Sequence, residues 1–282
     1  MLLASRRAML TMGVVALCAG AIVSAVAADA KRPITKLSYD PSLPKVELFD
    51  GLDSGTLTAK VIPQSQFGGK VLITNTTKTP VTVKLPESVV GVQVFPQALG
   101  GGLGGMGGGM GGMGGMGGGM GGMGGMGGGQ MMGGGMGGMG GGGAGFFSIP
   151  AERTVSVPMN SVCLEHGKTN PNSRMTYRLV RPSDVSDKPE LPELLKLIGS
   201  NKIERGAAQA AAWHIASGMT WEQIAAEKWD HVGQPDSPYF TPDQIMAGRM
   251  AVSDVQAKAR EKAKEKKEEP KADGVRTAIT AK

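Results

Sequence analysis

The sequence is poor in the residues that most often carry catalysis, metal binding or disulfide bonds. It has two cysteines and three histidines in 282 residues. Cys18 lies in the N-terminal apolar segment, so a chain cleaved after that segment keeps only Cys163 and cannot form an internal disulfide. No metal cluster, phosphate-binding loop or carboxylate pair has diagnostic spacing. We therefore expect no enzymatic activity and no cofactor.

Residues 1–28 predict an export signal. Arg6 and Arg7 precede an uncharged apolar stretch, and small residues at 25–28 suit cleavage. The arginine pair also resembles a twin-arginine signal, so both the general and the twin-arginine routes stay open. Cleavage removes two arginines and lowers the net charge from +6 to +4. That excess does not by itself indicate nucleic acid binding. We expect a periplasmic, cell-envelope or secreted protein that meets a membrane only through its signal.

The middle of the chain, residues 99–145, has no charged residue, no proline and no aromatic residue. Of the 46 residues from 100 to 145, 32 are glycine and 11 are methionine, which is too little bulky apolar surface to offset the entropy of ordering. The repeat resembles the Gly-Gly-Met tails of chaperonins in composition. We predict a disordered loop inserted between two strands.

Methionine spacing within this tract suggests one alternative function. Met113 and Met116 lie three residues apart, as do Met123 and Met126, and thioethers are soft ligands suited to Cu(I). The tract has no histidine or cysteine to strengthen such a site. Copper binding therefore stays an alternative to a simple expanded loop.

Short alternating segments on both sides of the tract predict strands. They are 57–61, 71–75, 81–85, 92–95, 146–149, 155–157 and 177–179. Neither side has enough strands for a closed structure, but together they do. We predict an α+β protein in which residues 29–98 and 146–182 form one antiparallel β-sandwich, interrupted by the disordered Gly/Met-rich loop.

The pattern becomes helical after the predicted sandwich. Residues 183–256 predict a small helical region, with helices over 192–198, 202–217 and 220–228 and a last one from Pro242 toward Glu269. Capping boxes are expected at residues 201–204, 220–223 and 241–244. Residues 257–282 are rich in Lys and Glu and predict a charged, partly disordered tail.

The single cysteine of the cleaved chain lies near other reactive residues. Cys163, His166 and Met175 resemble the last copper-binding loop of cupredoxins, but no histidine precedes His166 to complete such a site. A nucleophilic Cys163–His166 pair is disfavoured because residues three apart in an extended chain point to opposite faces. We expect His214 to be a packing or surface residue, and Cys163, between Val162 and Leu164, to be buried.

A further pattern joins Cys163 to a helix. Cys163-Leu-Glu165 and Gln209-Ala-Ala-Ala-Trp213 resemble the thioester domains of bacterial surface adhesins, which carry Cys-hydrophobic-acid on a strand and Thr-Gln-x-Ala-x-Trp on a helix. Ala208 replaces the threonine. The resemblance implies that the sulfur of Cys163 and the side-chain carbonyl of Gln209 join with loss of ammonia, and later acylate an amine on a partner. The alternative is a surface Gln209 and a small buried Cys163.

Over most of the cleaved chain, the segment 75–86, the Gly-rich insert and Cys163-Leu-Glu-His-Gly-Lys168 resemble uncharacterised exported bacterial proteins of planctomycete type. That resemblance implies a location and no activity. The function we expect is a non-enzymatic structural or interaction protein of the envelope, or a secreted one, whose partner is an unknown protein or envelope component. A thioester adhesin and a Cu(I)-binding protein are the alternatives.

Overall fold

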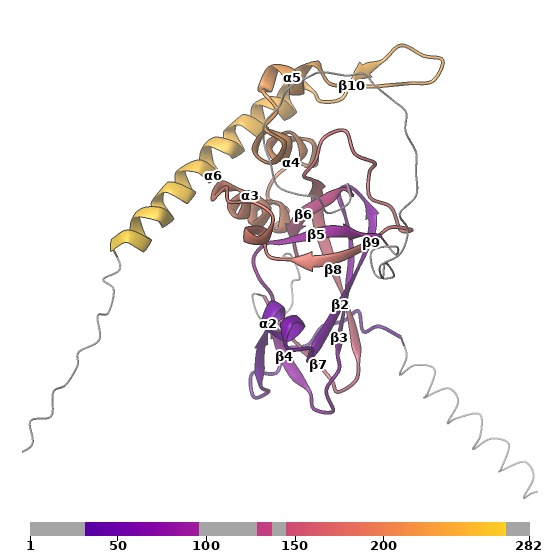
Figure 1. Ribbon diagram of the computed structural model, residues 1–282, viewed down its shortest axis with the longest axis vertical. Coiled ribbons are helices and arrows are strands. Elements are labelled where there is room, and N and C mark those ends of the chain that lie inside the picture. Colours follow the sequence, from indigo (N-terminus) through magenta and orange to yellow (C-terminus); the bar gives the residue numbers. More distant parts are fainter. Residues whose placement is uncertain (1–31, 96–128, 137–144, 269–282) are drawn as a thin grey trace, which may run out of the picture.

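The computed structural model describes residues 32–95, 129–136 and 145–268. These residues form a mixed α+β structure in three parts. A β-barrel lies in the middle, a small sheet and a short helix lie at one end of it, and a group of helices covers the other end (Figure 1). The export signal predicted over residues 1–28 lies outside the described residues.

The barrel has six antiparallel strands in the order β2-β3-β8-β6-β5-β9. Their bounds are β2 (Leu57–Ser65), β3 (Gly68–Asn75), β5 (Val89–Val94), β6 (Met131–Gly135), β8 (Thr154–Cys163) and β9 (Thr176–Val180). The sheet closes where β9, already paired with β5, also pairs with β2 at Val61 and Tyr177. Alternate side chains of these strands point inward and form the apolar core.

The predicted sandwich is therefore wrong in architecture, although all seven predicted segments form strands. The difference arises at β6, which the sequence pattern did not indicate. This strand pairs with β5 on one side and β8 on the other, and so joins the chain before the Gly/Met tract to the chain after it. Without β6 those two strands would each leave an open edge, and the sheet would not close.

The strand β6 comes from inside the Gly/Met tract, so the expectation of disorder across 99–145 is wrong for residues 131–135. Glycine is required there because neighbouring chains pass very close. A Cβ atom on Gly133 would lie 2.6 Å from Leu195, one on Gly135 would lie 2.9 Å from the Cα of Gly199, and one on Gly134 would overlap the carbonyl oxygen of Asn160. Met132 and Met136 fill the core beside these glycines. In β6, therefore, the glycines of the repeat allow close packing and its methionines fill the core.

A second, three-stranded sheet lies at the end of the barrel opposite the helices. It contains β1 (Lys45–Glu47), β4 (Val81–Lys84) and β7 (Phe146–Ile149), with β1 parallel to β4 and β7 antiparallel to it. The short helix α2 (Leu48–Asp53) follows β1 directly. Glu47 caps this helix by accepting hydrogen bonds from two of its backbone N–H groups.

The helices after the barrel follow the predicted order. They are η2 (Pro182–Asp184), α3 (Glu190–Gly199), α4 (Arg205–Ala212), the π-helical turn η3 (Trp213–Ser217), α5 (Trp221–Ala226) and α6 (Pro242–Glu268). The capping boxes at Thr220 and Thr241 are confirmed. The box predicted at Asn201 is wrong: Asn201 has φ 55°, and Glu204 caps α4 through the N–H of Ala207.

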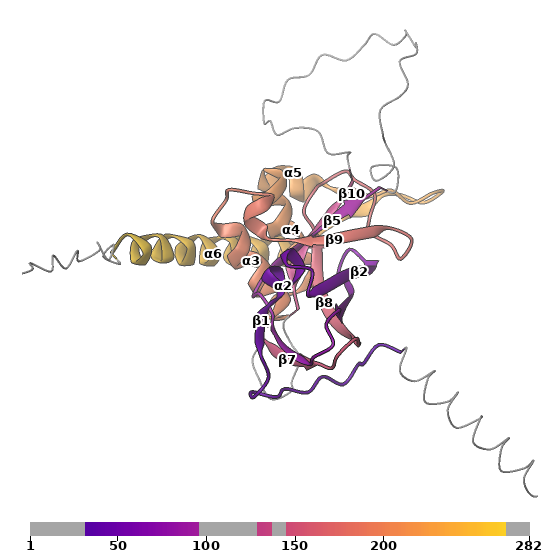
Figure 2. The same cartoon turned by 60° about the horizontal axis from the view of Figure 1, so that its bottom comes forward.

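A small hairpin of β10 (Lys228–Trp229) and β11 (Ser237–Pro238) lies between α5 and α6. The helices α3 and α4 pack on the barrel and on the first half of α6, sharing one apolar cluster with Val162 and Leu164 of the strand end. The second half of α6 extends away from the rest of the molecule (Figure 2), and its side chains from 260 to 265 are exposed. The end of β8 therefore lies at the junction between barrel and helices.

Candidate functional site

The last residue of β8, Cys163, lies inside this junction. Its side chain is 1% exposed, which confirms the predicted burial. On one side Cys163 pairs with Met132 of β6, and the chain continues through Leu164, whose N–H donates to the carbonyl oxygen of Met131 at 2.9 Å. The strand formed by the Gly/Met tract thus covers one side of the cysteine.

Helix α4 covers another side. Five of its eight residues are alanine, and six consecutive residues, 207–212, are buried. Small side chains allow a helix to approach its neighbours closely, and the tight contact of Ala207 with Gly248 of α6 is an example. Gln209 is the only polar residue in this buried run, and it is 1% exposed. The alternative in which Gln209 is a surface residue is therefore wrong.

Cys163 and Gln209 are in direct contact, although they lie 46 residues apart in the chain. The Oε1 atom of Gln209 accepts from the backbone N–H of Cys163 at 3.0 Å, and its Nε2 donates to the backbone carbonyl of Cys163 at 2.7 Å. The backbone of Cys163 thus holds both polar atoms of the carboxamide. The structure brings together the two residues that the thioester pattern singled out.

The thiol itself is protonated at neutral pH. Burial, and then the negative charge of Glu165, raise the pKa of Cys163 to about 12. Its Sγ donates to Oδ1 of Asn170, 3.7 Å away. A thiol in this state is a poor metal ligand, and it can act as a nucleophile only where its proton is transferred during the attack.

The imidazole of His166 has a different partner from the thiol. Its Nε2 lies 3.0 Å from Oε1 of Glu227, and its ring packs edge-on against Trp213 with 4.7 Å between ring centroids. The sulfur of Met175, the third residue of the cupredoxin-like pattern, accepts from the hydroxyl of Tyr177 at 3.6 Å. His214 packs by stacking on Trp221. The copper loop and the Cys–His pair gain no support from these contacts.

A second buried glutamine, Gln130, lies at the start of β6 and is 2% exposed. Its Oε1 accepts from the N–H of Glu165 at 3.2 Å, and its Nε2 donates to the carbonyl of Glu165 at 3.0 Å. The carboxylate of Glu165 also accepts from Lys168 Nζ at 2.6 Å and from the N–H of Met131 at 3.0 Å. The segment after β8 is thus held by one glutamine from each side.

Sequence reasoning missed Gln130, Lys168, Asn170 and Glu227. A signal existed for the first: Gln130 is the only polar side chain between residues 99 and 145. The other three belong to irregular segments, where no periodic pattern indicates a direction for the side chain.

The methionines named for Cu(I), at positions 113, 116, 123 and 126, lie outside the described residues. Within 32–95, 129–136 and 145–268, no group of three or more His, Cys, Asp or Glu side chains is arranged to hold a metal ion. Across the same ranges no helix has the length and apolar character needed to cross a membrane.

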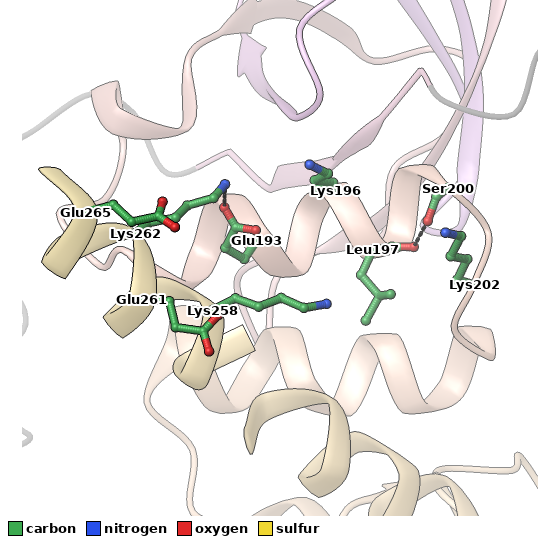
Figure 3. Close-up of a pocket in the computed structure, with 9 residues that line it drawn as sticks. All are labelled: Glu193, Lys196, Leu197, Ser200, Lys202, Lys258, Glu261, Lys262 and Glu265. Atoms are coloured by element: carbon green, nitrogen blue, oxygen red, sulfur yellow. Dashed lines mark hydrogen bonds and ion pairs between the residues drawn. The ribbon is translucent and has the colours of Figure 1, made fainter. Parts of the chain in front are cut away.

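A groove of about 380 Å³ lies between α3 and α6 (Figure 3). Four lysines and three glutamates line it, and Lys262 pairs with Glu193 across it. Leu197 is the only apolar residue of the lining. Ligand pockets usually have mostly apolar walls with few polar groups, so we assign no ligand to this solvated groove.

Comparisons with protein-family models, with curated protein sequences and with solved structures find no match to this chain.

Proposed function

We propose that this protein is an exported interaction protein that attaches to its partner covalently, through an internal thioester between Cys163 and Gln209. One observation carries the proposal: the carboxamide of Gln209 is held on the backbone of Cys163 by two hydrogen bonds, with both residues 1% exposed. The resemblance to adhesin thioester domains named these same two residues. Because each molecule could use its thioester only once, the proposed function is binding and not catalysis with turnover.

The bond would form by a balanced exchange. The sulfur of Cys163 attacks the carboxamide carbon of Gln209, a C–S bond forms, and the C–N bond breaks. The thiol proton goes to the departing nitrogen, which leaves as ammonia. The backbone N–H of Cys163 already donates to Oε1, the oxygen that carries negative charge during this attack. The proposal is supported by the two hydrogen bonds that hold the carboxamide on the residue that carries the sulfur, with one donor on the carboxamide oxygen.

The same environment would preserve the thioester. Burial keeps water away from the bond, and a thiol with a pKa of about 12 leaves slowly when a weak nucleophile attacks. An amine is a stronger nucleophile than water at neutral pH. The bond would therefore persist until a partner amine reaches it.

The mass of the purified chain tests the proposal. We expect a mass about 17 Da below that of the Cys163→Ser variant after correction for the substituted atom, because ammonia has been lost. Gln209→Ala should abolish this deficit and release a thiol that an alkylating reagent labels after denaturation. Comparing variants makes the result independent of where the signal is cleaved.

Gln130→Ala is the matched control. Gln130 holds Glu165 as Gln209 holds Cys163, but no thiol lies on the residue that it holds. This variant should keep the mass deficit. A wild-type chain with no deficit and with Cys163 fully labelled on denaturation would contradict the thioester. Gln209 would then be a structural residue, and the protein a non-covalent interaction protein.

A further inference from the structure

Beside the Cys163–Gln209 contact lies a group of aromatic side chains with one carboxylate, which we call the amine cluster: Trp213, Trp229, Tyr239 and Glu227. The rings of Trp229 and Tyr239 are stacked, with centroids 4.6 Å apart and planes 16° apart. Tyr239 and Trp213 lie 5.3 Å apart. His166 packs on Trp213 and lies 3.0 Å from the carboxylate of Glu227, which it holds in place beside the rings.

The cluster borders the proposed thioester. Trp213 follows Gln209 by four residues on continuous helical backbone, so both side chains lie on the same helix face. His166 follows Cys163 by three residues, and its N–H donates to Ser217 Oγ at 3.0 Å. Burial, and then the charges of Cys163 and Glu227, raise the pKa of Tyr239.

The cluster also reaches solvent. Trp229 is 44% exposed, and the side chain of Glu227 is 29% exposed. Trp213 is 6% exposed, and its indole N–H has no hydrogen-bond partner among the described residues. A buried donor without a partner is unusual in a native protein. It would need an acceptor, so it does not itself contact an ammonium ion. The cluster thus runs from the exposed ring of Trp229 to the buried ring of Trp213.

We propose that the amine cluster binds the cationic primary amine, such as a lysine side chain of a partner protein, that the thioester captures. This inference rests on the proposed function and adds the chemical class of the partner group. Ammonium ions bind aromatic faces within about 6 Å of the ring, and a carboxylate attracts them. Among the described residues, no lysine or arginine lies over the rings of Trp213, Trp229 or Tyr239, whereas Arg249 lies 5.4 Å above Trp221.

The capture step balances with these residues alone. The bound ammonium gives one proton to the carboxylate of Glu227. The amine nitrogen then attacks the carbonyl carbon of Gln209, a C–N bond forms, and the C–S bond breaks with its electron pair on sulfur. The second amine proton goes to the sulfur, which restores the thiol of Cys163, and Glu227 returns its proton to water. The products are an amide and a free thiol.

The test compares a cationic nucleophile with an uncharged one. Cadaverine carries ammonium groups, whereas hydroxylamine is neutral near pH 7. We expect Glu227→Gln and Trp229→Ala to lower the rate of cadaverine adduct formation, followed by intact mass, about 10-fold. The hydroxylamine rate should change less than about 2-fold, because that probe gains nothing from cation binding. Equal changes for the two probes, or no change, would overturn the inference.

Trp221→Ala is the matched control for loss of an aromatic ring, because the face of Trp221 already holds Arg249. Trp221 also stacks on His214 and packs against the apolar cluster that contains Trp213, so urea unfolding must first show that the variant is folded. It should alter neither rate. A separate readout keeps this inference distinct from the thioester: cadaverine should quench or shift the tryptophan fluorescence of Cys163→Ser, and Trp229→Ala in that background should weaken the response. Absence of binding to Cys163→Ser would reject the amine cluster even if the mass deficit is present. Binding without a mass deficit would reject the thioester and keep the cluster as a cation site.

Discussion

Two glutamines contact the end of β8, one from α4 and one from the residue before β6, and make the same pair of hydrogen bonds. Gln209 of α4 accepts from the N–H and donates to the carbonyl of Cys163, and Gln130 does the same for Glu165. Both are buried, at 1% and 2% exposure. A carboxamide can replace a missing strand neighbour in this way, because its C=O and NH2 groups match the backbone N–H and C=O.

The two contacts differ in the side chain of the residue that the glutamine holds. At Glu165 the side chain is a carboxylate paired with Lys168, so the contact completes the hydrogen bonding of the segment and has no further chemistry. At Cys163 the held residue carries a thiol, and Gln209 carries a carboxamide carbon that a thiol can attack. The comparison teaches that a buried glutamine is not reactive by its own contacts. The neighbouring thiol is what makes Gln209 a candidate for bond formation.

The largest loss of stability should come from a substitution in β6, the strand that follows Gln130. Gly134→Ala places a Cβ against the backbone of Asn160 and Ser161, where no side chain can move aside. We expect a loss of about 3 kcal/mol or more in the free energy of unfolding, since the overlap separates β6 from β8. Urea unfolding followed by circular dichroism measures it. A loss below about 1 kcal/mol would mean that β6 is not required for the closed barrel.

Replacing each glutamine with alanine compares directly how much the two pairs of hydrogen bonds stabilise the fold. In the Cys163→Ser background, where Gln209 keeps its carboxamide, Gln209→Ala leaves a buried N–H and a buried C=O of residue 163 unpaired, which costs about 2–4 kcal/mol in the free energy of unfolding. Gln130→Ala should cost less, about 1–2 kcal/mol, because the partner groups around Glu165 are partly open to water. Urea titrations of the two variants test the order. A larger loss of stability for Gln130→Ala would mean that Gln130, and not Gln209, contributes more to the stability of the junction between barrel and helices.

The smallest effect, when the pH is raised only about one unit above 9, concerns ionisation and sharpens the comparison at the thiol. When the thiol is free, its ordinary pKa of 9.0 applies to the unfolded chain and about 12 to the folded chain. Between these values the unfolded chain binds fewer protons, so the free energy of unfolding falls as pH rises, by up to about 1.4 kcal/mol per pH unit. Below pH 9 the contribution is fully present.

Unfolding at pH values on both sides of 9, for wild type and Cys163→Ser, measures this term. A chain with an intact thioester has no thiol to ionise, so the wild type should match Cys163→Ser until methylamine opens the bond. The extra pH dependence should then appear. Its presence in the untreated wild type would indicate a free thiol and count against the thioester.

Much of the fold could be predicted from alternation and capping. The seven strand segments, the order of the helices and the capping boxes at Thr220 and Thr241 follow from local sequence, because side-chain periodicity and caps are local properties. The strand β6 could not be predicted in this way. Its glycines have low strand propensity, and only their close contacts with Leu195, Asn160 and Gly199 explain them.

The candidate site, too, could be predicted from the sequence only in part. The pattern around Cys163 and Gln209 named both residues from sequence, and the flanking Val162 and Leu164 predicted the burial of the cysteine. The sequence did not indicate Gln130, Asn170 or the position of Glu227, since loops set those side chains beside β8. It also left Gln209 undecided between surface and interior, because an alanine-rich helix has no clear polar face.

The sequence by itself determined most strand and helix segments, the single cysteine outside the predicted export signal and the two residues of the thioester pattern, because each depends on neighbouring residues. Only the tertiary structure decided that the sheet closes as a barrel and that part of the Gly/Met tract closes it. It also decided that Gln209 lies buried on Cys163 rather than at the surface. Those outcomes depend on contacts between segments far apart in the chain, where packing space and unpaired backbone groups select the partner.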